Sequence, residues 1–197
     1  MLINNIIAIL IAYLIGSISS AIVVCRIMRL PDPRTQGSRN PGATNVLRIG
    51  GKKAAIITLL GDALKGFLPI IIARVLGFDD TVLGLIAFAA FLGHLFPVYF
   101  RFEGGKGVAT LIGCLLALNW PTGLCFLATW GLIAVIFRYS SLASLVATLL
   151  SPIFIWMWTG NWVWVGVAGL MSVALIIRHR ENIVKLAKGQ ESKIGKR

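Results

Sequence analysis

Residues 54–77, AAIITLLGDALKGFLPIIIARVLG, decide the class of this protein. In a helix, about 20 predominantly apolar residues cross the roughly 30 Å hydrocarbon core of a bilayer, so this stretch is long enough for a transmembrane helix. Six other apolar stretches accompany it. The seven predicted spans cover approximately residues 3–25, 54–77, 81–100, 108–119, 122–138, 141–159 and 162–178. Residues 108–119 are few for a complete span, and we expect this helix to be tilted or partly buried.

The composition of the whole chain agrees with this pattern. Hydrophobic residues make up 57% of its 197 residues, charged residues make up 13%, and the mean hydropathy is +0.87. These values exclude a water-soluble enzyme and a disordered chain. We therefore predict an all-α membrane protein: a single integral membrane domain, residues 1–197, that forms a bundle of seven transmembrane helices. The spans leave no room for a soluble catalytic domain, so any chemistry must occur at the membrane surface.

Lysine and arginine predict the orientation of the chain. There are 19 of them against seven acidic residues, which gives a formal net charge of +12. With the N-terminus outside and the C-terminus in the cytoplasm, 17 of the 19 lie in cytoplasmic connections, at the cytoplasmic ends of spans or in a cytoplasmic tail, residues 179–197, in agreement with the positive-inside rule. We expect these cations to rest against anionic lipid rather than nucleic acid. The tail is predicted to begin as an interfacial helix and then to fray.

The polar connection RTQGSRNPGATNVLRIGGKK, residues 34–53, holds the first candidate site. Its glycines allow unusual backbone angles, its short polar side chains form hydrogen bonds, and its arginines and lysines supply positive charge, which together suit a phosphate or an oxyanion. An ordinary positive-inside loop is the alternative, although such a loop needs only charge. The candidate residues are Gly37, Ser38, Asn40, Thr44, Asn45 and Arg48.

A second glycine-rich element, FEGGKGVAT, covers residues 102–110. Free backbone N–H groups at a helix start, glycines that permit close approach and one lysine together form an anion cradle. The element is not a Walker A loop, because Gly107 follows Lys106 where that motif has serine or threonine. A flexible hinge between spans is the alternative. The candidate residues are Gly104, Gly105, Lys106, Gly107 and Thr110.

The end of the last predicted span supplies a third group. His179 and Asn182 are three residues apart and share one face of a helix. A histidine there could orient a hydroxyl or transfer a proton near neutral pH, and an interfacial histidine without a chemical role is the alternative. Ser141, at the start of the sixth span, lies on the same predicted side, where it could equally cap its helix.

Three polar residues lie inside the predicted spans. Asp62 and Lys65 are three residues apart, so they can form a structural ion pair or the inner wall of a site. His94, near the cytoplasmic end of its span, is predicted to form a hydrogen bond between helices rather than to catalyse a reaction.

Three motifs resemble those of one known family. Residues 34–51 resemble the signature G-S-G-N-x-G-A-T-N-x-x-R-x-x-G, residues 93–110 resemble G-H-x-x-P followed by F-x-G-G-K-G-V-A-T, and residues 178–191 resemble R-H-x-x-N-I-x-R-L-x-x-G-x-E. These motifs are similar to those of the bacterial acyl-phosphate:glycerol-3-phosphate acyltransferases, the PlsY family. Two positions depart from them: Arg39 replaces the second glycine of G-S-G-N, and Lys185 replaces a frequent arginine.

The resemblance implies transfer of a fatty acyl group from acyl phosphate to the 1-hydroxyl of sn-glycerol 3-phosphate. The products would be 1-acyl-sn-glycerol 3-phosphate (lysophosphatidic acid) and phosphate, in the first step of phospholipid synthesis. It also implies a multi-pass protein of the bacterial inner membrane with its active site on the cytoplasmic face. We expect no cofactor, no metal and a monomer, and we leave open a contact with the enzyme that produces acyl phosphate.

The motif positions predict how the two substrates are held. Two phosphates near charge −2, about 6 Å apart at an effective dielectric constant of about 20, repel each other by roughly 11 kcal/mol, so several cations are needed. Ser38, Arg48 and Lys106 with its glycine amides are expected to hold the acyl phosphate. The residues expected to hold and orient glycerol 3-phosphate are His179, Asn182 and Ser141. The assignment of the two phosphates to the two cradles stays open.

Other reactions and functions are less compatible with the chain. It has neither the H-x-x-x-x-D motif of thioester-dependent acyltransferases nor a G-x-S-x-G nucleophile elbow, so we predict direct transfer without an acyl-enzyme. A phosphate or phospholipid transporter is the chief alternative. It would need polar residues through the bilayer, where this chain offers essentially Asp62 and Lys65. A CDP-alcohol phosphotransferase would need clustered aspartates for a metal.

Overall fold

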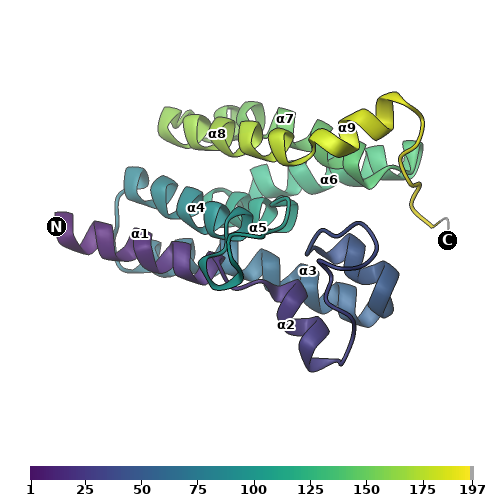
Figure 1. The fold of residues 1–197 in the computed structure, drawn as a ribbon. Helices are drawn as coiled ribbons and strands as arrows, with labels where there is room; N and C mark the ends of the chain where they lie inside the picture. The colour runs from purple at the N-terminus through teal and green to yellow at the C-terminus, as the bar shows by residue number, and fades with distance from the viewer. Residues whose placement is uncertain (196–197) are drawn as a thin grey trace. The chain divides into compact units, whose positions relative to one another are not determined.

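The structure, a computed structural model, describes residues 1–195, and the chain forms helices without a β-strand in that range (Figure 1). The elements are α1 (Leu2–Gly16), α2 (Ser20–Ile27), α3 (Ala43–Val75), α4 (Asp80–Leu95), the 3₁₀ helix η1 (Val98–Phe100), α5 (Val108–Leu118), α6 (Trp120–Phe137), α7 (Ser140–Thr159), α8 (Trp162–Arg178) and α9 (Arg180–Ala187). They divide into two compact units, Met1–Leu118 and Asn119–Arg197.

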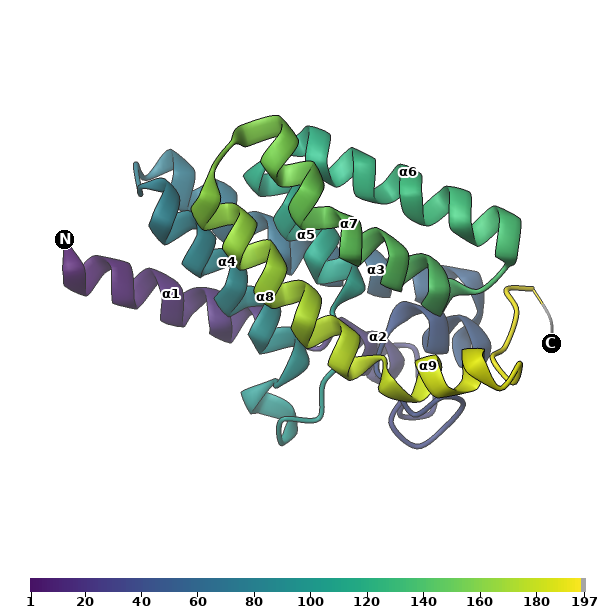
Figure 2. The ribbon, with the colours of Figure 1, turned by 90° about the horizontal axis from the view of Figure 1, so that it is seen from above.

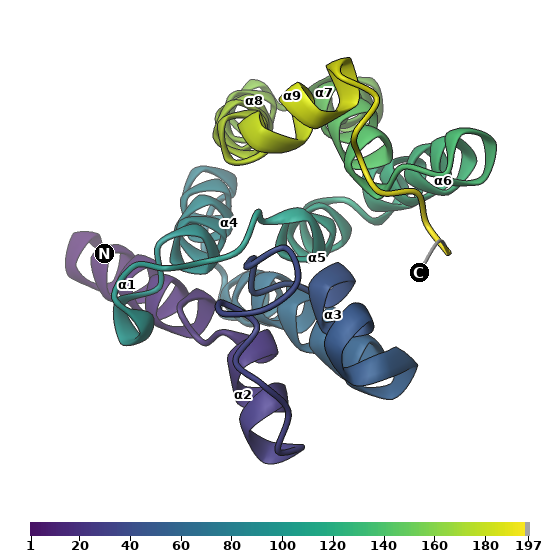
Figure 3. The same cartoon turned by 45° about the vertical axis from the view of Figure 1, so that its right-hand side comes forward.

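In the first unit, α1 packs against α4 and α3 packs against α5 (Figure 3). Glycines allow the helices to approach closely, because a side chain on Gly16 would collide with the carbonyl of Ala90, and one on Gly113 would collide with the carbonyl of Ala63. Small residues at helix contacts are typical of membrane proteins, where apolar burial alone does not hold helices together. Because residues 1–195 form helices without a β-strand, the all-helical prediction is confirmed for this range.

The first predicted span is broken rather than continuous. It consists of α1 and α2, which are bent by 43° across a short break. The break frees backbone carbonyls, and the ammonium group of Lys65, on α3, donates a hydrogen bond of 2.7 Å to the carbonyl of Ile18. In a membrane, a broken helix needs a partner of this kind for its released backbone groups.

The second predicted span also starts differently. Helix α3 begins at Ala43, so residues 43–50, which we expected to belong to a polar loop, are helical. Gly51, at φ 75°, marks a kink between this first part and the longer apolar part. The first part is held by packing, since Val46 is fully buried in a cluster with Val24 and Cys25 of α2. The tertiary contact explains a helix that the polar composition of the segment does not predict.

Four helical segments are long and apolar enough to cross a membrane: α3, Asp80–Phe100, α6 and α7. The bent pairs α1–α2 and α8–α9 each pass the same test when taken together, and α5 is a shorter apolar helix. The positions of these helices agree with the predicted apolar stretches. The count of seven spans and the orientation of the termini stay predictions.

In the second unit, α7 lies between α6 and α8 (Figure 2). Polar side chains join the three helices, because Trp130 Nε1 donates to Ser144 Oγ at 3.1 Å and Ser172 Oγ donates to the carbonyl of Thr148 at 2.9 Å. The bend of 61° between α8 and α9 agrees with a span that ends near residue 178.

The tail does not fray after α9, which corrects our expectation for the residues that the structure describes. Two hydrogen bonds join Ile194 to Arg138. The Ile194 N–H donates to the Arg138 carbonyl at 2.6 Å, and the Ile194 carbonyl accepts from the Arg138 guanidinium at 2.9 Å. The ammonium of Lys193 also lies 5.6 Å from the centre of the Tyr139 ring. Residues 188–195 are thus tied back to the junction of α6 and α7, while residues 196–197 of the predicted tail lie outside the described part.

Candidate functional site

Residues 33–42, here called the Asn45 loop, are organised around one buried side chain. Asn45, in the first turns of α3, is only 1% exposed. Its Nδ2 donates to the carbonyls of Pro33 and Gln36 at 2.8 and 3.0 Å, and its Oδ1 accepts from the N–H of Ser38 at 2.9 Å. The amide therefore replaces three backbone partners that a loop of this shape lacks. Asn45 was predicted to bind substrate, and in the structure its side-chain amide holds the backbone of the loop in shape.

Two left-handed residues bend the Asn45 loop. Gly37 has φ 61°, and a side chain there would collide with Asn45 Oδ1, so both the angle and the space require glycine. Arg39 has φ 56°, in the region that favours glycine. The backbone angle that the family signature implies at this position is therefore kept, although the residue is arginine.

The other predicted residues of this motif lie at the surface of the loop and of α3. Ser38, Thr44 and Arg48 are exposed, and Asn40 is half-buried. Thr44 and Arg48 are four residues apart, so they share one face of the first part of α3. Their side chains are accessible to a ligand, as a binding role requires.

The glycine segment, residues 104–107, is pressed against the end of α4. A side chain on Gly104 would collide with the His94 and Leu95 carbonyls, and one on Gly107, at φ 94°, would collide with the Phe91 ring. The N–H of Gly105 donates to the His94 carbonyl at 3.2 Å, so it is not one of the free amides that we expected here. These glycines are explained by packing, and the first amides of α5, which begins at Val108, are the ones without an acceptor inside the helix.

The first two motifs meet at Gly105 within the first unit. A Cβ atom on this residue would lie 3.1 Å from the Pro41 carbonyl oxygen of the Asn45 loop. Lys106 follows directly and is half-buried. The structure thus brings the Asn45 loop and the glycine segment side by side, as a shared phosphate site would require.

Three ionisable side chains are buried beneath the glycine segment. The predicted ion pair forms, with 2.9 Å between Lys65 Nζ and Asp62 Oδ1, and both side chains are at most 6% exposed. His94 Nδ1 lies 3.7 Å from the same carboxylate oxygen, and its Nε2 faces Gly105 so closely that a side chain there would collide with it. Thr110, predicted to bind substrate, donates through Oγ1 to the Asp62 carbonyl at 3.0 Å. This cluster supports the glycine segment from the interior.

The third group of predicted residues belongs to the second unit. His179, 4% exposed, lies between α8 and α9, and its Nδ1 is 2.9 Å from the carbonyl of Leu175. Asn182 Nδ2 and Ser141 Oγ both donate to Glu191 Oε1, each at 2.8 Å. The carboxylate therefore fixes two of the predicted side chains. Ser141 does not cap α7, whose N-cap residue is Tyr139.

Glu191 is the residue of this group that our candidate set left out. It is one of only seven acidic residues in a strongly basic chain and lies among the lysines of the tail. Glu191 and Glu181 are the two acidic residues of this tail, and Glu191 occupies the glutamate position of the third family motif, so a signal was available in the sequence. Within residues 1–195, no group of three or more histidine, cysteine, aspartate or glutamate side chains is arranged to hold a metal ion.

Long apolar helices, glycine contacts between them and an ion pair buried inside them define a multi-pass integral membrane protein. A family model described as glycerol-3-phosphate acyltransferase matches residues 6–189. The chain belongs to the glycerol-3-phosphate acyltransferase family. It is an acyltransferase of phospholipid biosynthesis, so the family resemblance is confirmed and the transporter alternative is set aside.

Similar proteins extend over nearly the whole chain. A glycerol-3-phosphate acyltransferase of Methylococcus capsulatus is 53% identical over 184 residues, which cover 93% of each chain. One of Ralstonia pickettii is 60% identical over 191 residues, 94% of this chain and 92% of the relative. The crystal structure of PlsY (YgiH), an integral membrane glycerol 3-phosphate acyltransferase, in its glycerol 3-phosphate form matches with a TM-score of 0.93 and 38% identity, over 98% of this chain and 96% of that one.

Proposed function

We propose that this chain transfers a fatty acyl group from acyl phosphate to the 1-hydroxyl of sn-glycerol 3-phosphate, giving lysophosphatidic acid and inorganic phosphate. The observation that carries the proposal is the likeness to PlsY in two forms. These are the glycerol 3-phosphate form, with a TM-score of 0.93, and the lysophosphatidic acid form, with 0.90. They correspond to the acceptor and the product of this reaction. The three family motifs support acyl phosphate as the donor.

In this proposal, the first unit holds the acyl phosphate. Ser38, in the loop that Asn45 fixes, and Arg48, on α3, are exposed, and Lys106 lies two residues before Val108, where α5 starts. A helix N-terminus and nearby cations both favour an anion. Because the leaving phosphate gains negative charge as the acyl bond breaks, groups fixed around it stabilise the transition state more than the bound substrate.

The second unit holds and orients glycerol 3-phosphate. In a neutral imidazole, the bond from His179 Nδ1 to the Leu175 carbonyl places the proton on Nδ1, so Nε2 can accept a hydrogen bond that orients glycerol 3-phosphate. Glu191 holds Ser141 and Asn182 in place, so their remaining hydrogen-bonding groups have a fixed direction. A reactant held in one orientation loses less entropy on reaching the transition state.

The transfer is direct. The 1-oxygen of glycerol 3-phosphate bonds to the acyl carbon, the bond from that carbon to the phosphate oxygen breaks, and a substrate phosphate takes the hydroxyl proton. Acyl phosphate is a mixed anhydride that carries its own good leaving group, so neither a covalent intermediate nor a metal is needed. We place the active site on the cytoplasmic face of the inner membrane, in a monomer with seven spans, its N-terminus outside and its C-terminus inside.

A donor test decides the proposal. The detergent-purified protein should release phosphate and form lysophosphatidic acid from palmitoyl phosphate and glycerol 3-phosphate, in buffer with a chelator. The same protein with palmitoyl-CoA serves as the control and should be inactive. Equal activity with the thioester, loss of activity with the chelator, or a burst of phosphate without glycerol 3-phosphate would contradict the donor, the metal-free reaction or the direct transfer, respectively.

A further inference from the structure

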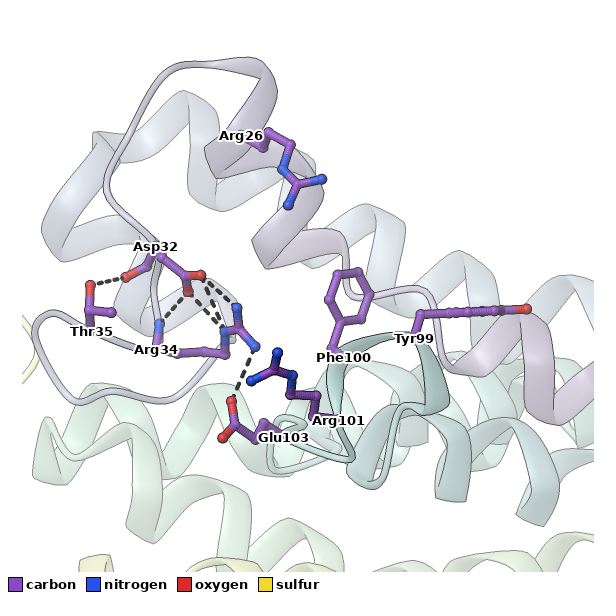
Figure 4. Close-up of a pocket in the computed structure, with 8 residues that line it drawn as sticks. All are labelled: Arg26, Asp32, Arg34, Thr35, Tyr99, Phe100, Arg101 and Glu103. Carbon is purple, nitrogen blue, oxygen red and sulfur yellow. Dashed lines mark hydrogen bonds and ion pairs between the residues drawn. The ribbon is translucent and has the colours of Figure 1, made fainter.

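A hollow of roughly 610 Å³ lies in the first unit, apart from Ser38, Arg48 and Lys106 (Figure 4). It is bounded by the end of α2, by the start of the Asn45 loop and by the turn after η1. Figure 4 shows that the guanidinium groups of Arg26, Arg34 and Arg101 point into one space, with the Phe100 ring at its side. Converging like charges are unfavourable unless anions lie among them.

Arg34 forms ion pairs with both carboxylates of the hollow, those of Asp32 and Glu103. Its Nη2 lies 2.8 Å from Asp32 Oδ2, and its Nη1 lies 3.1 Å from Glu103 Oε2, so it joins the loop to the turn after η1. The hydrogen bonds from Arg34 hold the pKa of Asp32 below its ordinary value, and both carboxylates raise the pKa of Arg34. Asp32 therefore remains charged, and Arg34 already compensates both carboxylates.

Arg26 and Arg101 carry the two positive charges of the hollow that no carboxylate of the described part of the chain pairs with. Neither guanidinium group makes a hydrogen bond or an ion pair within residues 1–195, and both side chains are exposed. Arg26 attracts Asp32 only at longer range. Two arginines that face one space can hold a phosphate through paired hydrogen bonds, because the guanidinium plane matches the spacing of phosphate oxygens.

The backbone that presents Arg101 is strained. Arg101 has φ 54° and the next residue, Phe102, has φ 61°, so two consecutive non-glycine residues occupy the left-handed region. This conformation costs an L-residue roughly 1–2 kcal/mol, and for a bulky residue such as phenylalanine it is rare. Strain of this kind is kept where the surroundings fix it, often at binding sites. Here it turns the Arg101 side chain into the hollow.

We propose that this hollow binds the headgroup phosphate of an anionic membrane phospholipid, separately from the two substrates. The apolar surroundings favour a lipid over a free anion: Ile27, Tyr99 and Phe102, beside or within the hollow, are 76%, 56% and 57% exposed. Exposed apolar side chains next to cations at the end of membrane helices fit the boundary between headgroups and acyl chains. An anionic lipid gives Arg26 and Arg101 the partner that the chain itself does not provide.

Lipid binding in uncharged detergent tests the site. The probe is dioctanoyl phosphatidylglycerol, titrated against the fluorescently labelled full chain by microscale thermophoresis. The parent should bind it at least tenfold more tightly than dioctanoyl phosphatidylcholine. An Arg26→Gln/Arg101→Gln variant should lose at least tenfold in affinity. The matched control, Arg29→Gln/Lys188→Gln, removes two exposed cations outside the hollow and should stay within twofold of the parent, as should Arg48→Ala.

The outcomes separate the explanations. Both charge-removal variants are expected to fold, because the four side chains are exposed, and an unchanged melting temperature checks this. Equal affinity of Arg26→Gln/Arg101→Gln and parent overturns the site, and so does a loss shared by the control variant. Equal binding of phosphatidylcholine overturns recognition of net charge. Displacement of the lipid by inorganic phosphate at equal concentration overturns the choice of a lipid over a free anion.

Discussion

The Asn45 loop and the tail around Glu191 are both polar segments that carry family motifs, yet they are held in opposite ways. In the loop, a buried asparagine binds backbone groups of residues 33–38, and the side chains predicted to bind substrate project outward. In the tail, a half-buried glutamate binds the predicted side chains themselves, Ser141 and Asn182. Two asparagines in different family motifs thus have different tasks: Asn45 maintains the shape of a loop, and Asn182 is itself held in position.

The largest effect is expected where the first unit presents its cations. Lys106→Met and Arg48→Ala should each lower kcat by at least about 100-fold, the scale of losing one group that stabilises charge in a transition state. Phosphate release from palmitoyl phosphate measures it. Lys53→Met, which removes an exposed lysine outside the proposed site, is the control and should be nearly normal. Near-normal rates in Lys106→Met and Arg48→Ala would mean that these cations serve only to orient the chain in the membrane.

The two asparagines test the comparison directly. Asn45→Ala removes three hydrogen bonds and leaves buried backbone groups unsatisfied, so it should destabilise the protein by about 2–4 kcal/mol. Asn182→Ala should cost less than about 1 kcal/mol, because its side chain is only partly buried and its Nδ2 bond of 2.8 Å goes to the side chain of Glu191, yet it should lower kcat/KM. Thermal unfolding in detergent and initial rates measure the two effects. Similar melting temperatures for both variants would contradict the distinction.

Glu191→Gln should have a smaller effect on turnover. The amide keeps the size of the side chain, but its single acceptor oxygen is uncharged and holds Ser141 and Asn182 less strongly. We expect KM for glycerol 3-phosphate to rise about tenfold, with KM for acyl phosphate nearly unchanged. Titration of each substrate at a saturating level of the other measures both. Equal changes in the two constants would show that Glu191 does not act on the acceptor alone.

The smallest effect is expected at Arg39. Because this residue occupies the left-handed region, Arg39→Gly should relieve strain and stabilise the protein by up to about 1 kcal/mol. Activity should be unchanged within about twofold, since the angle of the loop is already that of the family signature. A chemical or thermal unfolding curve checks the direction, and a loss of stability would mean that the Arg39 side chain contributes more than its backbone conformation costs.

The parts of the fold that could be predicted are those that depend on the local composition of the chain. The apolar stretches marked the long helices, and the spacing of Asp62 and Lys65 allowed the ion pair that forms, with the inner wall of a site as the alternative. The break between α1 and α2 was not predictable, because the residue that compensates it, Lys65, is distant in the sequence. The helical start of α3 likewise depends on the contact of Val46 with α2.

The candidate site shows the same division. Glycines, cations and short polar residues indicated a phosphate site, but their individual tasks depend on packing. Gly105 has its amide bonded to His94 rather than free, and Asn45 is turned inward. No local sequence pattern distinguishes a glycine that makes room for a ligand from one that lets a neighbouring helix pack closely. Glu191 could have been found, because it occupies the glutamate position of the third family motif.

The bond from Lys65 to Ile18 has a consequence for how the chain enters the membrane. A lysine inside a transmembrane helix raises the free energy of insertion by about 2.5–3.5 kcal/mol on biological scales. The carbonyl that compensates it belongs to the break after α1, which the ribosome makes first. When α3 leaves the translocon, its polar partner is therefore already in place, so we expect α1 and α3 to integrate as a pair. Biogenesis of this protein would then depend on an irregularity in its first helix.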